Sequence, residues 1–188
     1  MKAKKLFRNA YGLLGLFIVT LFFSSTAFAQ KEDTKLTKVK DDFTSEVTIS
    51  TEEIKVMGNS SWDASIYFVF KGDSIFLGIL HSSKWTPVEI FEISIIYEDG
   101  GTLKKVTHSI GNQVHQLVGY TAMPTFFTLN SEEFVKFSES AVSKMRINFN
   151  FEVDPVQDVS LKERTFEKIK SAALVLTAEL SKNRITQL

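Results

Sequence analysis

The strongest constraint on the fold is a two-residue rhythm of apolar and polar side chains that runs from Phe43 to Val153. Its clearest stretch, KMRINFNFEV at residues 144–153, alternates without a fault. Successive side chains of a β-strand point to opposite faces, so this rhythm is typical of strands with one buried face. Turn-forming residues bound the candidate strands, which are 43–50, 52–57, 64–71, 74–81, 88–98, 102–110, 113–118, 121–129 and 144–153. Many short strands at this spacing predict a mainly β fold, an antiparallel β-sandwich of about seven to nine strands.

Three dipeptides that tolerate a positive φ predict the hairpins of this sandwich. They are Gly72-Asp73, Asp99-Gly100 and Gly111-Asn112, each placed between two alternating segments. A two-residue loop at the first of them predicts three apolar pairs on one face, which are Phe70 with Ile75, Phe68 with Leu77 and Ile66 with Ile79. The reverse face is apolar too, with Tyr67, Val69, Phe76 and Leu80. We therefore expect this hairpin to be central and covered on both sides.

Two segments leave the two-residue rhythm and predict helices. Residues 161–182 place apolar side chains at steps of three and four, which predicts a long amphipathic helix near the C-terminus. This helix is expected to cover the second face of the central hairpin. Ser160 and Glu163 have the spacing of a capping box at its start. A short helix is expected near 131–138, with Phe134 and Phe137 facing inward.

The first residues have the three parts of a secretory signal peptide. A cationic start at 2–8 precedes an apolar run at 11–23, and small side chains follow at Ala27 and Ala29. The run is shorter than the roughly 20 residues of a spanning helix, so we expect cleavage after Ala29 and no membrane span afterwards. An uncleaved membrane anchor is the alternative. No cysteine follows the run, which excludes a lipoprotein. The expected location is the periplasm or the medium.

The rest of the chain suits one domain. Residues 30–42 are charged and lack apolar periodicity, which indicates a flexible lead or a weak edge strand, and residues 43–188 form the expected domain. Without its first 29 residues the chain keeps 18 Lys and Arg against 22 Asp and Glu, a net charge of −4. Nucleic acid is therefore not an expected partner. With no cysteine there is no disulfide framework, and the core, rich in the 17 Phe residues, must supply the stability.

Several stretches resemble a broad set of small exported bacterial proteins of unknown function. They are KVKDDFTSEVTIST at the start of the domain, the EDGG turn, LNSEEFVKF, and MRINFNFEV. The resemblance covers most of the chain after the signal segment. It implies a compact, β-rich exported domain.

One candidate ligand site gathers two tryptophans at the open end of the central hairpin. The expected register places Trp62 and Trp85 there, with His81 and Lys84 nearby. Indole rings cover the C–H faces of sugars while polar neighbours bind the hydroxyls, so these four residues form a candidate glycan site. The competing interpretation is that each indole closes one end of the core.

A second candidate is the pair His108 and His115. A two-residue loop at Gly111-Asn112 would place them opposite one another, close enough to share a metal ion. Zinc needs a third protein ligand, and the neighbouring sequence offers none, so two partly exposed histidines are the simpler interpretation. No cofactor is expected.

The sequence lacks the signatures of known enzyme classes. It contains no G-x-S-x-G elbow, S-x-x-K, H-E-x-x-H, P-loop or dinucleotide glycine fingerprint. The polar side of the 144–153 strand, with Arg146, Asn148 and Asn150, is expected to be a solvated face and only secondarily a ligand surface. We expect an exported, non-enzymatic binding or interaction module of the bacterial envelope, with a protein or a cell-envelope glycan as partner. The alternatives are a hydrolase or metal-dependent enzyme using His108 or His115, and a structural envelope component whose C-terminal helix docks on another chain.

Overall fold

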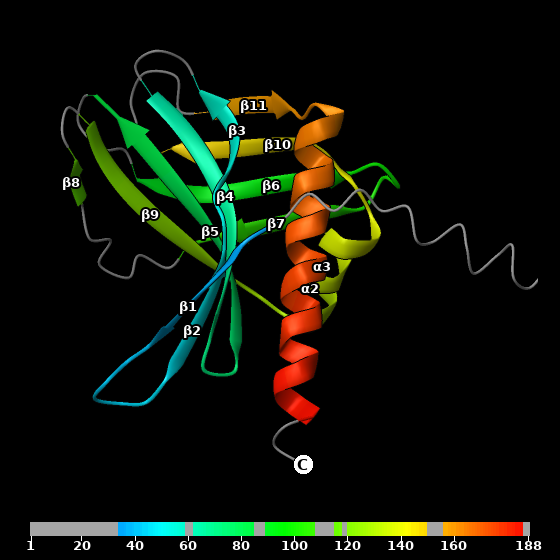
Figure 1. Cartoon of the computed structure of the whole chain (residues 1–188). Helices are drawn as coiled ribbons and strands as arrows, with labels where there is room; N and C mark the ends of the chain where they lie inside the picture. Colours follow the sequence, from blue (N-terminus) through cyan, green and yellow to red (C-terminus); the bar gives the residue numbers. More distant parts are fainter. Residues whose placement is uncertain are drawn as a thin grey trace, which may run out of the picture. The chain divides into compact units, whose positions relative to one another are not determined.

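The described part of the chain forms two antiparallel sheets with two helices. The computed structural model describes residues 34–58, 62–84, 89–107, 115–117, 120–149 and 156–185, which belong to a compact unit beginning at Thr34. Within these ranges eleven strands form one seven-stranded and one four-stranded sheet (Figure 1). Both sheets contribute buried side chains to a single core. The expected antiparallel β-sandwich with a C-terminal helix is confirmed. No helix in the described ranges is long and apolar enough to cross a bilayer.

The larger sheet has the order β1-β2-β4-β5-β9-β8, and β3 also pairs with β4. Its strands are β1 (Leu36–Lys40), β2 (Val47–Thr51), β3 (Ile54–Gly58), β4 (Trp62–Lys71), β5 (Ser74–Ser83), β8 (His115–Leu117) and β9 (Tyr120–Leu129). Of the two expectations for residues 30–42, the edge strand applies to Leu36–Lys40, because these residues pair with β2 along their whole length at the end of the sheet. A hydrogen bond of 2.6 Å from Lys38 to Glu179 ties the same strand to the C-terminal helix.

The smaller sheet has the order β11-β10-β6-β7. Its strands are β6 (Ile90–Tyr97), β7 (Thr102–Val106), β10 (Val142–Phe149) and β11 (Val156–Ser160). The alternation of KMRINFNF is reproduced in β10, where Met145, Ile147 and Phe149 are buried in the core. The sequence did not indicate β11, whose side chains are mostly exposed.

The central β4–β5 hairpin has the predicted register. Phe70 lies opposite Ile75, Phe68 opposite Leu77, and Ile66 opposite Ile79. The turn is possible because Gly72 adopts a φ of 58°, where a side chain would be strained. The Asp99-Gly100 turn is present as well, although its loop is longer than two residues, since the Tyr97 N–H bonds to the Gly101 carbonyl.

One side of β4 pairs with an interrupted strand. Ser50 of β2 lies opposite Val69, whereas Ile54 of β3 lies opposite Ile66, so the β2–β3 side holds one extra residue, a β-bulge at 52–53. The buried Thr51 hydroxyl accepts a hydrogen bond of 2.9 Å from the Phe68 N–H at this break. A second register shift follows between Lys55 and Met57. In the described chain β3 pairs with β4 alone.

Both helices complete the same core. Helix α2 (Ser131–Glu139) packs Phe134 and Phe137 against Phe68, with centroid distances of 5.3 and 5.1 Å. Helix α3 (Glu163–Ile185) fully buries Ile169, Ala172, Ala173 and Leu176. These residues share one cluster with the inner faces of both sheets. The expectation that α3 covers the second face of the central hairpin is therefore wrong.

The capping box also lies elsewhere than expected. Ser160 is the last residue of β11, opposite Lys144, and α3 begins at Glu163. At α2, in contrast, the Asn130 side chain accepts from the Glu133 N–H, and the Glu133 carboxylate accepts from the Asn130 N–H. A capping box therefore stabilises the start of α2. The Ser160–Glu163 pattern cannot cap α3 in this way, because Ser160 is paired within β11.

Candidate functional site

Two of the four residues of the predicted tryptophan site, Trp62 and His81, are in contact at one end of the core. Trp62 and His81 have ring centroids 6.0 Å apart. Both rings also contact Phe149 of β10, at 6.4 and 5.1 Å between centroids. Lys84 follows β5 and is exposed, whereas Trp85 lies outside the described residues. His81 is only 4% exposed, so its ring belongs to the core between the sheets.

Burial gives His81 a predictable response to acid. Loss of hydration lowers the pKa of His81, and the charge of Asp63 raises it by less. The unfolded chain therefore binds more protons just below pH 6.5, and the free energy of unfolding falls as the pH drops through that range. We expect His81→Phe to remove this part of the acid sensitivity. Urea unfolding at about pH 7.5 and 5.5 tests it, and equal losses in both proteins would contradict it.

Only one of the two histidines of the predicted metal site, His115, belongs to the described residues. His108 lies outside them, as does the Gly111-Asn112 loop. The backbone of His115 belongs to β8, where it is in register with Ala122 of β9. In the described ranges no three His, Asp or Glu side chains gather closely enough to hold a metal ion.

The polar side of β10 makes contacts with its neighbouring strands. The Arg146 guanidinium donates two hydrogen bonds of 2.5 and 2.6 Å to the Asp158 carboxylate on β11. Asn148 donates to Glu92 on β6 at 2.7 Å, and Glu92 also pairs with Lys104 of β7 at 2.8 Å. Asn150 lies outside the described residues. These cross-strand pairs explain the polar side of β10 as an ordinary solvated face of the sheet.

The outer face of the larger sheet carries an aromatic cluster, two of whose residues, Tyr67 and Phe76, were expected to be covered. It consists of Tyr67 on β4, Phe76 on β5 and Phe126 on β9, three strands that lie side by side (Figure 1). We call these three residues the outer aromatic cluster. Phe126 meets Tyr67 and Phe76 edge-to-face, with centroids 6.1 and 6.4 Å apart. Phe126 remains 43% exposed, so a large apolar ring faces solvent at the middle of the sheet.

A glycine beneath the cluster sets the position of the tyrosine ring. Gly78 stands between Tyr67 and Phe126 in the strand register. A Cβ atom at Gly78 would lie 2.6 Å from the Tyr67 Cζ atom, so the ring rests directly on the glycine backbone. Glycine weakens a strand interior, and close approach of another group is a common reason for its presence. Gly78 therefore allows Tyr67 to lie against the sheet.

Polar groups adjoin the outer aromatic cluster along β3 and β4. Burial, together with the charge of Glu53, raises the pKa of Tyr67 to about 12, so its hydroxyl stays protonated at neutral pH. Burial and the charge of Asp63 raise the pKa of Glu53. Asp63 itself pairs with Lys55 at 2.8 Å. Neither the Tyr67 hydroxyl nor the Glu53 carboxylate forms a hydrogen bond with a described residue; a hydroxyl can donate and a carboxylate can accept.

A pocket continues from this polar margin to the C-terminal helix. It has a volume of about 380 Å³ at the β2–β3 bulge. The bulge contributes Glu52, Glu53, Ile54 and Lys55, and the first turns of α3 contribute Arg164, Thr165 and Lys168. Glu53 and Lys55 both line this pocket. Glu53 also lies close enough to Tyr67 of the outer aromatic cluster for its charge to raise the pKa of that tyrosine.

Two signals in the sequence point to the outer aromatic cluster. One is Gly78 within an otherwise continuous apolar strand, and the other is the pair of adjacent aromatic residues Phe126 and Phe127, only one of which can face the core. The geometry of the outer aromatic cluster is the basis for assigning it a role. The chain matches no protein-family model, and it has no significant match among curated proteins or solved structures.

Proposed function

We propose that this chain is an exported, non-enzymatic binding module of the bacterial envelope, and that it binds a neutral glycan on the outer aromatic cluster. The observation that carries the proposal is the exposure of Phe126, in contact with Tyr67, on a rigid sheet face. Exposed apolar rings on a β scaffold have a cost in water and are often binding sites. Aromatic rings pack against the C–H groups of a sugar without further rearrangement.

The polar margin supports a sugar as the ligand. A sugar presents hydroxyls beside its C–H faces, and the margin offers the Tyr67 hydroxyl as donor and the Glu53 carboxylate as acceptor. Glu53 and Asp63 are both acidic, and Lys55 is already paired with Asp63. An acidic glycan would meet repulsion at Glu53, so a neutral glycan is the better match.

Substitution of the exposed ring tests this proposal. Phe126→Ala is expected to weaken binding of a neutral glycan about tenfold, or about 1.4 kcal/mol, because it removes the ring that a sugar would cover. Isothermal titration with soluble hexamers of glucose, xylose and N-acetylglucosamine measures the affinity. An oligogalacturonate serves as the acidic counterpart and is expected to bind more weakly.

The control for this experiment is an equally exposed phenylalanine on the other sheet. Phe91 of β6 is 42% exposed, against 43% for Phe126. Phe91→Ala should therefore leave glycan affinity unchanged while matching the change in exposed apolar surface. Failure of all the neutral hexamers to bind, or equal affinities of the two variants, would refute the proposal.

A further inference from the structure

The most exposed large side chain in the described residues is Phe43, at the tip of the β1–β2 hairpin. It is 99% exposed, although burial of a phenylalanine is strongly favoured. Figure 1 shows this tip (blue) at the end of the hairpin farthest from the smaller sheet and separate from both helices. Its position is independent of the outer aromatic cluster, which lies on β4, β5 and β9.

The loop that displays Phe43 is built from specific contacts. The Asp41 carboxylate accepts hydrogen bonds of 2.8 Å from the N–H groups of both Phe43 and Thr44. The Asp41 N–H donates to the Glu46 carbonyl, and the Ser45 N–H donates to the Asp41 carbonyl. Ser45 has a φ of 59°, a left-handed conformation that is uncommon without glycine. These contacts close the loop and fix the direction of the Phe43 backbone.

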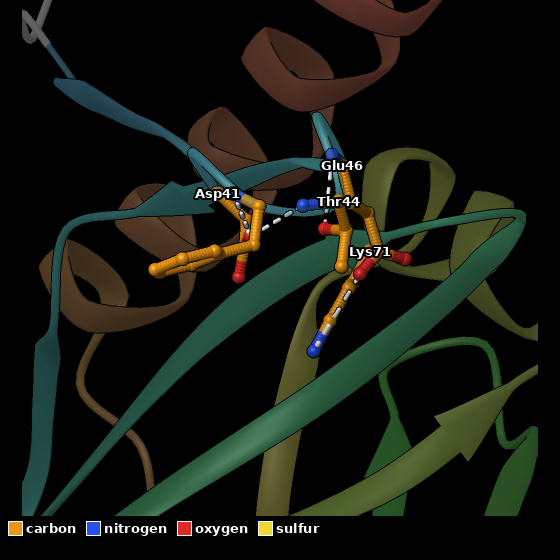
Figure 2. A network of polar contacts seen from close by, with 5 residues as sticks. Asp41, Thr44, Glu46 and Lys71 are labelled. Atoms are coloured by element: carbon orange, nitrogen blue, oxygen red, sulfur yellow. Dashed lines mark hydrogen bonds and ion pairs between the residues drawn. The ribbon is translucent and has the colours of Figure 1, made fainter.

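The neighbouring turn strengthens the base of this loop. Figure 2 shows Lys71 of β4 reaching Glu46, with an ion pair of 3.7 Å. In the same view the Asp41 carboxylate accepts a hydrogen bond from the Thr44 N–H. The Thr44 hydroxyl accepts from the Glu46 N–H at 3.2 Å. The Glu46 carboxylate also lies close to Gly72, so the β4–β5 turn and this loop are adjacent. A preorganised loop loses little entropy when it binds.

Acidic residues outnumber basic ones in the loop of Phe43 and in the adjacent turn. Asp41 and Asp42 precede Phe43, and Asp73 belongs to the adjacent turn. Lys71 is paired with Glu46, which leaves Lys40 as the nearest cation in sequence against these three acids. A bacterial lipid surface is anionic and would repel this tip, whereas a protein pocket with basic residues at its rim would attract it.

We propose that the β1–β2 tip is a docking point for a second protein, which receives Phe43 in an apolar pocket rimmed by lysine or arginine side chains. A rigid aromatic anchor surrounded by complementary charge is the arrangement typical of interface hot spots. A different protein is the better match for the partner, because residues 30–188 of this chain carry a net charge of −4 and the acidic tip calls for a basic surface. The docking point is separate from the proposed glycan site, so a module with both could link a glycan to a protein.

Photo-crosslinking in intact cells that produce the full chain tests this docking point. A benzophenone amino acid replaces Phe43, and in the matched control it replaces Phe91, also an exposed phenylalanine. We expect one discrete protein adduct from position 43 and none from position 91. Asp42→Lys should lower the yield of that adduct at least about tenfold, because the added cation meets a basic rim.

The charge variant is suited to this test because Asp42 is exposed and takes no part in the contacts that close the loop. An unchanged urea midpoint would show that Asp42→Lys keeps the fold. The proposal is overturned by no adduct at position 43, by an adduct to lipid or to a second copy of this chain, or by an adduct that Asp42→Lys leaves unchanged. Phe126→Ala should not affect the adduct, so failure of this proposal and failure of glycan binding are separate results.

Discussion

A chain that ends at Ser160, and so lacks α3, is expected to be insoluble or unfolded. Helix α3 places Ile169 and Leu176 in the core at 0% exposure. Loss of one such side chain costs about 2–5 kcal/mol, and a whole domain is stable by only about 5–15 kcal/mol. Expression, solubility and circular dichroism of the truncated chain measure the outcome. A soluble, β-rich product of unchanged stability would instead favour a helix that docks on another chain.

Two leucines on α3 give a sharper form of the same experiment. Leu176 is fully buried, whereas Leu174 on the same helix is 49% exposed. Leu176→Ala is expected to lower the free energy of unfolding by about 2–5 kcal/mol, and Leu174→Ala by less than about 0.5 kcal/mol. Urea denaturation of both variants separates lost packing from the small change in helix propensity, since the same chemical change is made twice.

Phe137→Ala is expected to destabilise the domain by about 3–5 kcal/mol. Phe137 is fully buried and lies between Phe68 of β4 and Tyr97 of β6, with centroid distances of 5.1 and 5.6 Å. Its ring thus joins the two sheets as well as the helix. Removing it leaves a cavity that all three elements would have to close together. Thermal and urea unfolding at neutral pH measure the loss.

The control for Phe137 lies on the same short helix. Val135 is 39% exposed, whereas Phe137 is fully buried. Val135→Ala should change the free energy of unfolding by less than about 0.5 kcal/mol. Similar losses for the two variants would mean that α2 is not part of the core.

Local patterns predicted the elements whose structure depends on nearby residues. The register of the β4–β5 hairpin follows from Gly72 and from the apolar pairs on either side of it. The two phenylalanines of α2 and the buried side of β10 were likewise correct, because a helix or strand period decides which side chains share a face.

Long-range packing decided the features that local patterns missed. The outer face of β4 and β5 is apolar in sequence, yet both helices pack on the opposite face, so Tyr67 and Phe76 are only partly covered. Phe43 belongs to the same alternation as buried residues but lies beyond the end of the core. The bulge at 52–53 depends on the pairing with β4, which the residues of the bulge do not specify. Sequence analysis thus found the scaffold but not the outer aromatic cluster on its face.

The register shift within β3, an edge strand of the larger sheet, has a consequence for aggregation during folding. A flat edge strand can act as a template for strands of other molecules, which is how fibrils begin to grow. The register shift between Lys55 and Met57 breaks the regular spacing of N–H and carbonyl groups along β3, which pairs with β4 alone in the described chain. A chain that folds at high local concentration, with no disulfide to hold it, would gain from an edge that neighbouring copies cannot extend.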